Sequence, residues 1–462
     1  MLAKFKKKYI GDWDFYQKYL LLAIPMILQN AITNLVSFLD NIMVGQLGTE
    51  QMSGVAIVNQ LIFVYNLAIF GAVSAASIFG AQYFGKGNHK GHMYSFRFKL
   101  YATLLVTGGA ILLFLTKGSA LISLYLTDTV GNGATDLALQ YGLEYLAIMM
   151  VGLIPFAVNQ SYATNIKETG QTFIPMLASF VAVGTNAILD YLMIFGIGPF
   201  PELGVQGAAL ATVIARYIEA LIVVIWAHIH RGKNRYLEGA YTGFGIPLAE
   251  LKAILIKGFP LMMNEVLWAA GMTTVTQCYS VRGLDVVAGL NIASTITNLF
   301  HIVYLQLGSC ISIVVGQYLG AGKLEDAKDA DNKMIVFSVF CCVIMAALMF
   351  VVGGFFPGIY NTTEEIRELA TSFIAVSAII MPFCAFSHAS YFTLRSGGKT
   401  VVTFLFDSVF TWVIVVPAAY LLAHFTGLGI VSIYFLVQGT ELIKVIIGYL
   451  MVKSNVWVVQ MV

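Results

Sequence analysis

Acidic and amide side chains stand inside stretches of this sequence that are otherwise apolar, and these residue types can bind ions. Asp40 lies in an apolar run over residues 19–44 with no basic residue beside it. A carboxylate at membrane depth is costly and is tolerated mainly where it faces protein or water. Helical spacing puts further polar residues on the same face, namely Asn30, Thr33 and Ser37. The pattern predicts a polar stripe that ends in a titratable acid.

A second acid, Asp190, falls in another apolar run, and Asn186 precedes it by one helical turn. With Asn159 and Thr212 these residues could form one cluster of oxygen ligands around Asp40. Two carboxylates that share a poorly solvated site interact as a pair and can take up and release one proton. The oxygens of Asp40, Asn186, Asp190 and Thr212 could instead hold Na⁺. The simpler alternative is that each residue only makes a hydrogen bond between helices.

The second half of the chain carries two intramembrane acids of its own, Glu265 and Asp407. Either could contact a substrate or assist a coupling ion, and we expect Asn30, Ser37 and Asp40 to contact substrate from the first half. Two prolines within apolar runs, Pro25 and Pro260, are candidate hinges because proline frees a backbone carbonyl in a helix.

Two other pairs of charges have the spacing of helical neighbours. Arg216 and Glu219 are three residues apart, as are Glu441 and Lys444. We expect each pair to form a local ion pair without a further role.

The elements that must position these residues are membrane helices. Hydrophobic residues make up 58% of the 462 residues and charged residues 11%, far below the roughly 25% of soluble proteins. About twelve apolar runs are long enough to cross a bilayer. We therefore predict an all-α integral membrane protein with 12 transmembrane helices. Nearly all lysines and arginines fall on one side of these runs, so the positive-inside rule places both termini in the cytoplasm.

Several function classes are excluded by what the sequence lacks. It has no phosphate-binding glycine loop, no nucleophile elbow and no zinc-type spacing of histidine and cysteine. We expect no enzymatic activity, no cofactor beyond the coupling ion and no nucleic acid partner. An ion gradient, or the gradient of the substrate itself, must then drive any transport.

An internal repeat organises the chain. A shift of 235 positions places Pro25 on Pro260 and the segment 82–87 on the segment 317–322 without a gap. Six helices per half give both halves the same orientation, so the repeat is parallel. We predict an N-terminal lobe over 1–235, a cytoplasmic linker over 236–256 and a C-terminal lobe over 257–462. Substrate would bind between the lobes, and one lobe would rock against the other.

Three segments resemble a known family. Residues 40–48, with Asp40, Val44, Gly45, Leu47 and Gly48, resemble the first-helix hallmark of multidrug and toxic compound extrusion (MATE) transporters. Residues 81–88 and 203–212 resemble the family's second-helix exit and sixth-helix entry. With the repeat and the helix count, the resemblance covers essentially the whole chain.

The resemblance implies a V-shaped pair of six-helix bundles that exports cationic, amphipathic drugs in exchange for H⁺ or Na⁺. In prokaryotic members similar to the DinF type, the coupling site matches Asp40, Asn186, Asp190 and Thr212, and a bending proline matches Pro25. The chain departs from the NorM type, because the tenth run carries Cys384, Ser387 and His388 where that type has an aspartate. It also reads Ile166-Lys167-Glu168 where the family has Leu-Arg-Ala.

On this interpretation the protein is a monomer in the plasma membrane, surrounded by lipid, and its substrates are small cations. The main alternative is a flippase for lipid-linked oligosaccharides or lipids, from the related superfamily. Such a flippase would favour a cationic central cavity, whereas this sequence places acids within its apolar runs.

Overall fold

The computed structural model describes residues 9–126, 134–243 and 245–462, and within these the side chains of 36–38 are left aside. Every regular element in the described residues is helical, which confirms the all-α prediction. Apolar runs form helices in a membrane because, for a single segment, only a helix pairs the backbone N–H and C=O groups within the segment itself. The long helices of the first half are α2 (Trp13–Gly45), α3 (Thr49–Lys86), α4 (His89–Ser123), α5 (Ala134–Val151), α6 (Leu153–Glu168), α7 (Phe173–Ile194) and α8 (Gly204–Ile229).

The second half follows the same plan with more interruptions. Its elements are α9 (Leu248–Ser280), α10 (Leu284–Gly320), α11 (Leu324–Gly353), η2 (Phe356–Ile359), α12 (Glu364–Ser396), α13 (Thr400–Phe404), η3 (Leu405–Val409), η4 (Thr411–Val415), α14 (Val416–Phe425), α15 (Ile430–Gly439) and α16 (Glu441–Lys453). A short 3₁₀ turn, η1 (Arg235–Leu237), lies between the halves.

Eleven spans in the described residues are long and apolar enough to cross a membrane, and a twelfth arises if the bent pair α5 and α6 counts as one. The two helices of that pair meet at an angle of 44°. Gly152 separates them and Pro155 follows in the first turn of α6, where proline has no amide hydrogen to donate. The prediction of twelve spans is confirmed in this form, with the bent pair as the fourth span.

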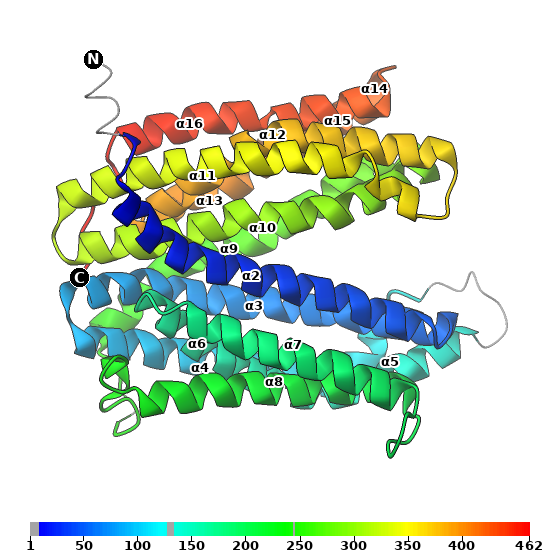
Figure 1. Ribbon diagram of the computed structural model, residues 1–462, viewed down its shortest axis with the longest axis horizontal. Helices are drawn as coiled ribbons and strands as arrows, with labels where there is room; N and C mark the ends of the chain where they lie inside the picture. The colour runs from blue at the N-terminus through cyan, green and yellow to red at the C-terminus, as the bar shows by residue number, and fades with distance from the viewer. Residues whose placement is uncertain (1–8, 127–133, 244) are drawn as a thin grey trace. The chain divides into compact units, whose positions relative to one another are not determined.

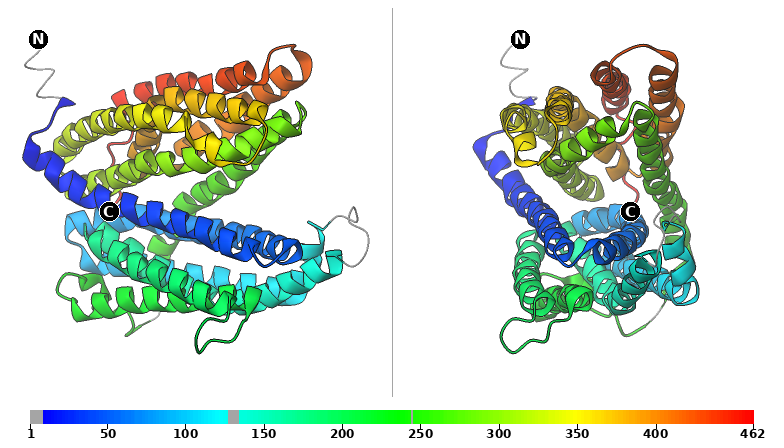
Figure 2. Two further views of the ribbon diagram at one scale, coloured as in Figure 1. Left: turned by 45° about the vertical axis from the view of Figure 1, so that its right-hand side comes forward. Right: turned by 90° about the vertical axis from the view of Figure 1, so that its right-hand side faces the viewer.

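By packing, the chain divides into two compact units. Unit 1 comprises Met1–Ala23, Ala81–Asn88 and Lys252–Val462, and unit 2 comprises Ile24–Gly80 and His89–Leu251. Within unit 1, α10, α11 and α12 lie side by side, and within unit 2, α7 lies along α8 (Figures 1 and 2). The start of α2 and the last turns of α3 thus belong to the unit that holds the second half of the chain.

The repeated motifs meet each other inside unit 1. A Cβ on Gly85 would lie 1.9 Å from the carbonyl oxygen of Gln317, and a Cβ on Gly320 would lie 1.9 Å from that of Gln82. Each glycine therefore packs on the backbone of the glutamine that begins the other copy of the motif. Only glycine permits so close an approach of two backbones. We call this contact the glycine crossing.

The C-terminal tail packs against the glycine crossing. Gln82 Nε2 donates to the carbonyls of Ser396 (2.9 Å) and Val459 (3.2 Å), and Gln82 Oε1 accepts from the backbone N–H of Met461 (2.8 Å). The indole of Trp457 is 1% exposed. The tail after α16 is therefore part of the folded core of unit 1.

The segment between the halves is attached to unit 2. Arg97 on α4 donates to the carbonyl oxygens of Gly239 (2.7 Å), Ala240 (2.9 Å) and Gly245 (2.7 Å). Tyr236 is 1% exposed and packs against the ring of Phe96. Burial raises the pKa of the Tyr236 hydroxyl, so the ring stays neutral. The predicted linker thus begins as an ordered, packed segment.

Candidate functional site

Unit 2 brings Asp40 and Asp190 together. Asp40 lies near the end of α2 and Asp190 near the end of α7, and their carboxyl groups interact side chain to side chain. Asp190 is 1% exposed, and its Oδ2 accepts a hydrogen bond from Asn186 Nδ2 at 2.9 Å. Oδ1 of each aspartate is buried and has no hydrogen-bond partner among the described residues. When its carboxyl group is ionised, each of these oxygens can only accept a hydrogen bond.

Two other residues predicted for this cluster, Thr212 and Asn159, differ in their burial and in their neighbours. Thr212 is half-buried on α8, which packs against α7. Asn159 on α6 is 3% exposed, and its side chain interacts with Glu219; no hydrogen bond from it to either aspartate occurs among the described residues. Tyr145 on α5, which the sequence reasoning missed, lies within electrostatic reach of both aspartates and donates to Asn59 Oδ1 at 3.3 Å. An isolated tyrosine in an apolar run gave no signal of this position.

Glu219 belongs to a second polar cluster of unit 2. Its Oε1 accepts from the hydroxyl of Ser179, which in turn accepts from Gln29 Nε2 at 2.7 Å. The local Arg216–Glu219 pair is wrong for this structure: Arg216 donates to the carbonyl of Gly152 at 3.3 Å, and no Arg216–Glu219 ion pair occurs among the described residues. The Arg216 guanidinium also lies 5.1 Å from the centre of the Phe156 ring. Arg216 and Glu219 thus both bind groups on other helices instead of each other.

One of the residues on α2 predicted to contact substrate uses its side chain for a hydrogen bond within the helix. Asn30 is half-buried, and its Nδ2 donates to the carbonyl of Met26 at 2.9 Å. The side chain of Ser37 lies outside the described residues. The two candidate hinges, Pro25 and Pro260, lie inside α2 and α9, where each removes one backbone hydrogen bond.

Unit 1 contains a buried ion pair that the sequence reasoning missed. Lys444 Nζ on α16 lies 2.6 Å from Asp407 Oδ1 on η3, and the two side chains are 8% and 15% exposed. The predicted Glu441–Lys444 local pair is therefore wrong. One oxygen of Glu441, Oε1, is buried with no hydrogen-bond partner in the described part of the chain. The lysine crosses to another helix because the carboxylate there is held in place by further hydrogen bonds.

Asn264 on α9 provides those hydrogen bonds. Its Nδ2 donates to Asp407 Oδ2 at 3.0 Å, and its Oδ1 accepts from the backbone N–H of Ser408 at 3.2 Å. Asp407 and Ser408 lie in η3, which is a π-helical segment, and η4 after it is another. Such segments leave backbone groups without their usual helical partner and often mark functional sites. Asn264 thus binds both the side chain and the backbone of the distorted turn.

Glu265, next to Asn264, is half-buried and lies within electrostatic reach of Arg395 and Asp407.

The tenth span carries no acidic residue at the place where the NorM type has an aspartate. His388 Nδ1 binds the carbonyl of Cys384 at 3.0 Å, and the ring packs 4.7 Å from that of Tyr304. Among the described residues, no group of three or more acidic, histidine or cysteine side chains could hold a metal ion.

Comparison with known proteins agrees with this architecture. A family model described as MatE matches the chain twice, over residues 25–192 and 260–421. The two matches start 235 residues apart, which is the offset of the sequence repeat.

Full-length relatives and solved structures were also found. Proteins named probable multidrug resistance protein NorM are 23% identical in Thermotoga maritima, over 89% of this chain and 86% of that protein, and 24% identical in Halalkalibacterium halodurans, over 89% and 88%. A solved MOP superfamily transporter from Pyrococcus furiosus aligns at a TM-score of 0.85 and 20% identity, covering 96% of both chains. A crystal structure of MATE in the bent conformation aligns equally well, at 0.85 and 20%, over 96% of this chain and 95% of that one.

The family model matches well over half of the chain, and the solved structures share its fold along nearly all of its length. The protein is thus a multi-pass membrane transporter and not an enzyme, and the chain belongs to the MatE family.

Proposed function

We propose that this protein exports cationic, amphipathic compounds in exchange for protons. The relatives named multidrug resistance proteins support the substrate class. The observation that carries the proposal is the pairing of Asp40 with Asp190, each with a buried Oδ1 to which no described residue donates a hydrogen bond. A site of this kind gains most from a species that supplies a donor or a positive charge.

A proton fits this site with few changes. One proton shared between the carboxyl groups turns two acceptor-only oxygens into a hydrogen-bonded pair and removes one negative charge. Asn186 holds Asp190 in position for this, because its amide already donates to Oδ2. Sodium is the other candidate, and it would draw on the oxygens of Asp40, Asp190, Asn186 and Thr212. We favour the proton because, among the described residues, no hydrogen bond joins Thr212 to either aspartate, as a ready-made set of oxygen ligands would be expected to show.

The two acids of unit 1 have different roles in this proposal. The charge of Asp407 is neutralised by Lys444, whereas Glu265 forms no ion pair with any residue that the structure describes. We therefore assign contact with a cationic substrate to Glu265, and to Asp407 the support of the π-helical turn.

The proposal places the protein as a monomer in the plasma membrane with both termini in the cytoplasm. The distribution of lysine and arginine along the sequence supports this orientation. Uptake of substrate would then occur from the cytoplasm and proton uptake from outside.

The flippase alternative gains little support from the buried cations. Within the described residues Lys444 pairs with Asp407 and Lys99 pairs with Glu168, so neither is available to a pyrophosphate group.

Transport by purified protein in proteoliposomes tests the proposal. We expect export of a fluorescent cation such as ethidium to follow an imposed pH gradient and not a Na⁺ gradient. Asp40→Asn and Asp190→Asn should each abolish the dependence on the pH gradient. Asp331→Asn is the matched control, since Asp331 is a 1% exposed aspartate in unit 1 that accepts from Thr393 Oγ1 at 2.5 Å. Export that is unchanged in the Asp40 and Asp190 variants, or that follows only Na⁺, contradicts the proton mechanism.

A further inference from the structure

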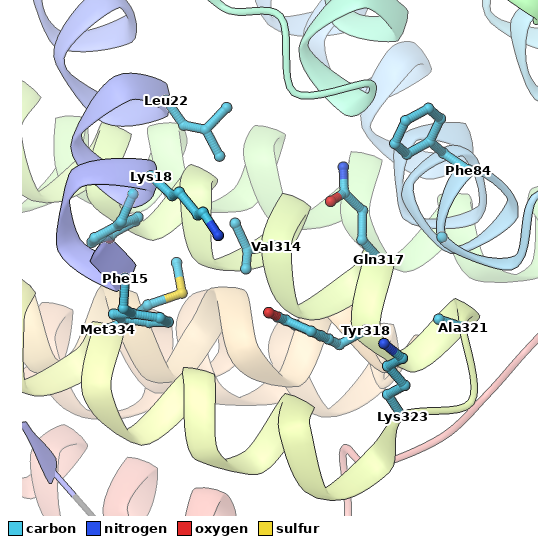
Figure 3. Close-up of a pocket in the computed structure, with 12 residues that line it drawn as sticks. Phe15, Lys18, Leu22, Phe84, Val314, Gln317, Tyr318, Ala321, Lys323 and Met334 are labelled. Atoms are coloured by element: carbon cyan, nitrogen blue, oxygen red, sulfur yellow. The ribbon is translucent and has the colours of Figure 1, made fainter. Parts of the chain in front are cut away.

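Unit 1 contains a pocket whose lining suits a ligand unlike the cations assigned to the transport pathway. It has a volume of about 410 Å³, within the range of roughly 300–1,000 Å³ usual for small-molecule sites. Four segments line it: the start of α2, the end of α3, the end of α10 and the start of α11 (Figure 3). Because all four are ends of membrane-spanning helices, the pocket lies near a membrane surface rather than at mid-depth.

The charged side chains of the pocket are all basic. Lys18 and Lys323 belong to its lining, and none of the twelve lining residues is acidic. Neither lysine has a salt bridge within the described ranges of the chain. Figure 3 shows the amino group of Lys18 directed into the pocket and that of Lys323 on the opposite side of Tyr318. Two unpaired ammonium groups at opposite ends of a small pocket favour a ligand with negative charge.

Much of the rest of the lining is apolar, although Tyr19, Gln317 and Tyr318 add polar groups. Phe15 and Leu22 come from α2, Phe84 from α3 and Val314 and Met334 from α10 and α11. Such side chains gain free energy by burying hydrocarbon and gain nothing from a free inorganic ion. The ligand must therefore carry both an anionic group and an apolar part.

The position of the lysines decides which amphiphile fits. Lys18 is five residues after the first residue of α2, about 8 Å along its axis, and Lys323 directly precedes α11. Lysines at this depth extend their amino groups to the headgroup layer while their stems stay on apolar surface. Trp13, at the start of α2, is 71% exposed and is typical of the membrane–water interface. The ligand thus comes from the bilayer itself.

We propose that this pocket binds an anionic glycerophospholipid, with its headgroup between Lys18 and Lys323 and the beginning of an acyl chain against Leu22 and Val314. The predicted orientation puts the site in the cytoplasmic leaflet, where basic pockets between membrane helices hold anionic headgroups. Gly85 and Gln317 of the glycine crossing also line the pocket, so the lipid would lie against this close backbone contact.

Native mass spectrometry of the purified full-length protein in detergent tests the proposal. The probe is phosphatidylglycerol, with phosphatidylcholine as the neutral-headgroup comparison. We expect one phosphatidylglycerol to be retained in preference to phosphatidylcholine. The double variant Lys18→Gln/Lys323→Gln should bind it about 30-fold more weakly, equivalent to about 1 kcal/mol for each lysine. Both lysines are exposed, so the substitutions do not disturb the fold.

The matched control removes the same amount of charge elsewhere. Lys328→Gln/Lys453→Gln alters two lysines that do not line the pocket and should retain phosphatidylglycerol as the unaltered protein does. Leu22→Asn should weaken lipid binding by removing part of the acyl contact.

Four results would overturn the proposal. They are equal retention by the Lys18/Lys323 variant, equal retention of phosphatidylcholine, displacement of the lipid by glycerol 3-phosphate at matched concentration, and competition by ethidium for the same position. The third result would mean a site for free phosphate compounds, and the fourth a second site for cationic substrates.

Discussion

Removal of the Lys444 side-chain charge should destabilise the protein strongly, because it leaves the carboxylate of Asp407 buried without a cation. The pair is 2.6 Å long, and its side chains are 8% and 15% exposed, so solvent screens it little. Breaking a buried pair from one side typically costs about 3–5 kcal/mol. We expect Lys444→Met to cost about 3 kcal/mol, the lower end of that range, because Asn264 still donates to Asp407 Oδ2.

The double variant Asp407→Asn/Lys444→Met separates the ion pair from the packing of its side chains. It removes both charges at once, and replacing a whole buried pair by neutral groups is often close to neutral in stability. We therefore expect the double variant to be more stable than Lys444→Met alone. Lys328→Gln is the control, because the Lys328–Glu325 pair is 30% and 86% exposed. An exposed pair of this kind contributes about 0–1 kcal/mol.

Thermal unfolding in detergent micelles measures these differences. A thiol-reactive fluorophore reports unfolding, since Cys278, Cys310 and Cys342 are buried in the folded protein. The reasoning is refuted if Lys444→Met unfolds at the same temperature as Lys328→Gln. It is also refuted if the double variant is as unstable as the single one, because the loss would then come from packing and not from an unpaired charge.

Two further substitutions test the packing of unit 1. Gly320→Ala should destabilise the protein by about 1–3 kcal/mol or more, because its Cβ would lie 1.9 Å from the backbone oxygen of Gln82. Gly108→Ala is the control, since no atom lies within 4 Å of the added Cβ, and it should be neutral or up to about 1 kcal/mol stabilising. Equal unfolding temperatures for these two variants would contradict the close contact. Trp457→Ala should cost about 3–5 kcal/mol, since the indole is 1% exposed and donates to the carbonyl of Val452 at 3.1 Å. A tail that only rests on the surface would instead tolerate this change in the same unfolding assay.

The pairing of Asp40 with Asp190 could be predicted from the sequence because both residues break a strong rule. An unpaired acid in an apolar helix is costly, so its presence is a signal in itself. The spacing of Asn186 and Asp190 by one helical turn predicts that their side chains meet, and the structure contains that hydrogen bond. Nothing comparable marks Tyr145, which is compatible with any apolar helix.

Partners across helices could not be predicted in the same way. Lys99 looks like one more cytoplasmic lysine in the sequence, yet it is 0% exposed, and its Nζ lies 2.5 Å from Glu168 Oε1. His92 lies 3.3 Å from the other carboxylate oxygen. Glu168 is one of the residues at which the chain departs from the Leu-Arg-Ala pattern of the family, and the structure gives the departure a physical role. A glutamate there neutralises a buried lysine that would otherwise be unpaired.

The same limit explains both wrong ion-pair predictions. Oppositely charged neighbours three residues apart on a helix surface contribute only about 0.2–0.5 kcal/mol. A tertiary contact that is buried and supported by further hydrogen bonds outweighs this easily. Lys444 therefore binds Asp407, which Asn264 already orients, and leaves its neighbour Glu441. Local spacing predicts an ion pair well only where no such partner exists, as at the exposed Lys328 and Glu325.

The two halves of the chain share a framework but not their chemistry, and the internal repeat allows this to be stated residue by residue. At the glycine crossing the two copies are equivalent, with Gly85 on Gln317 and Gly320 on Gln82. Asp40, in contrast, corresponds under the same shift to Val275, which is 4% exposed and belongs to a large apolar cluster of unit 1. A backbone contact that only glycine permits constrains both copies alike, whereas one side chain facing the interior can change without altering the helix. Under the proposed mechanism, ion coupling is therefore confined to the first half, while the second half keeps the same fold and uses its own acids differently.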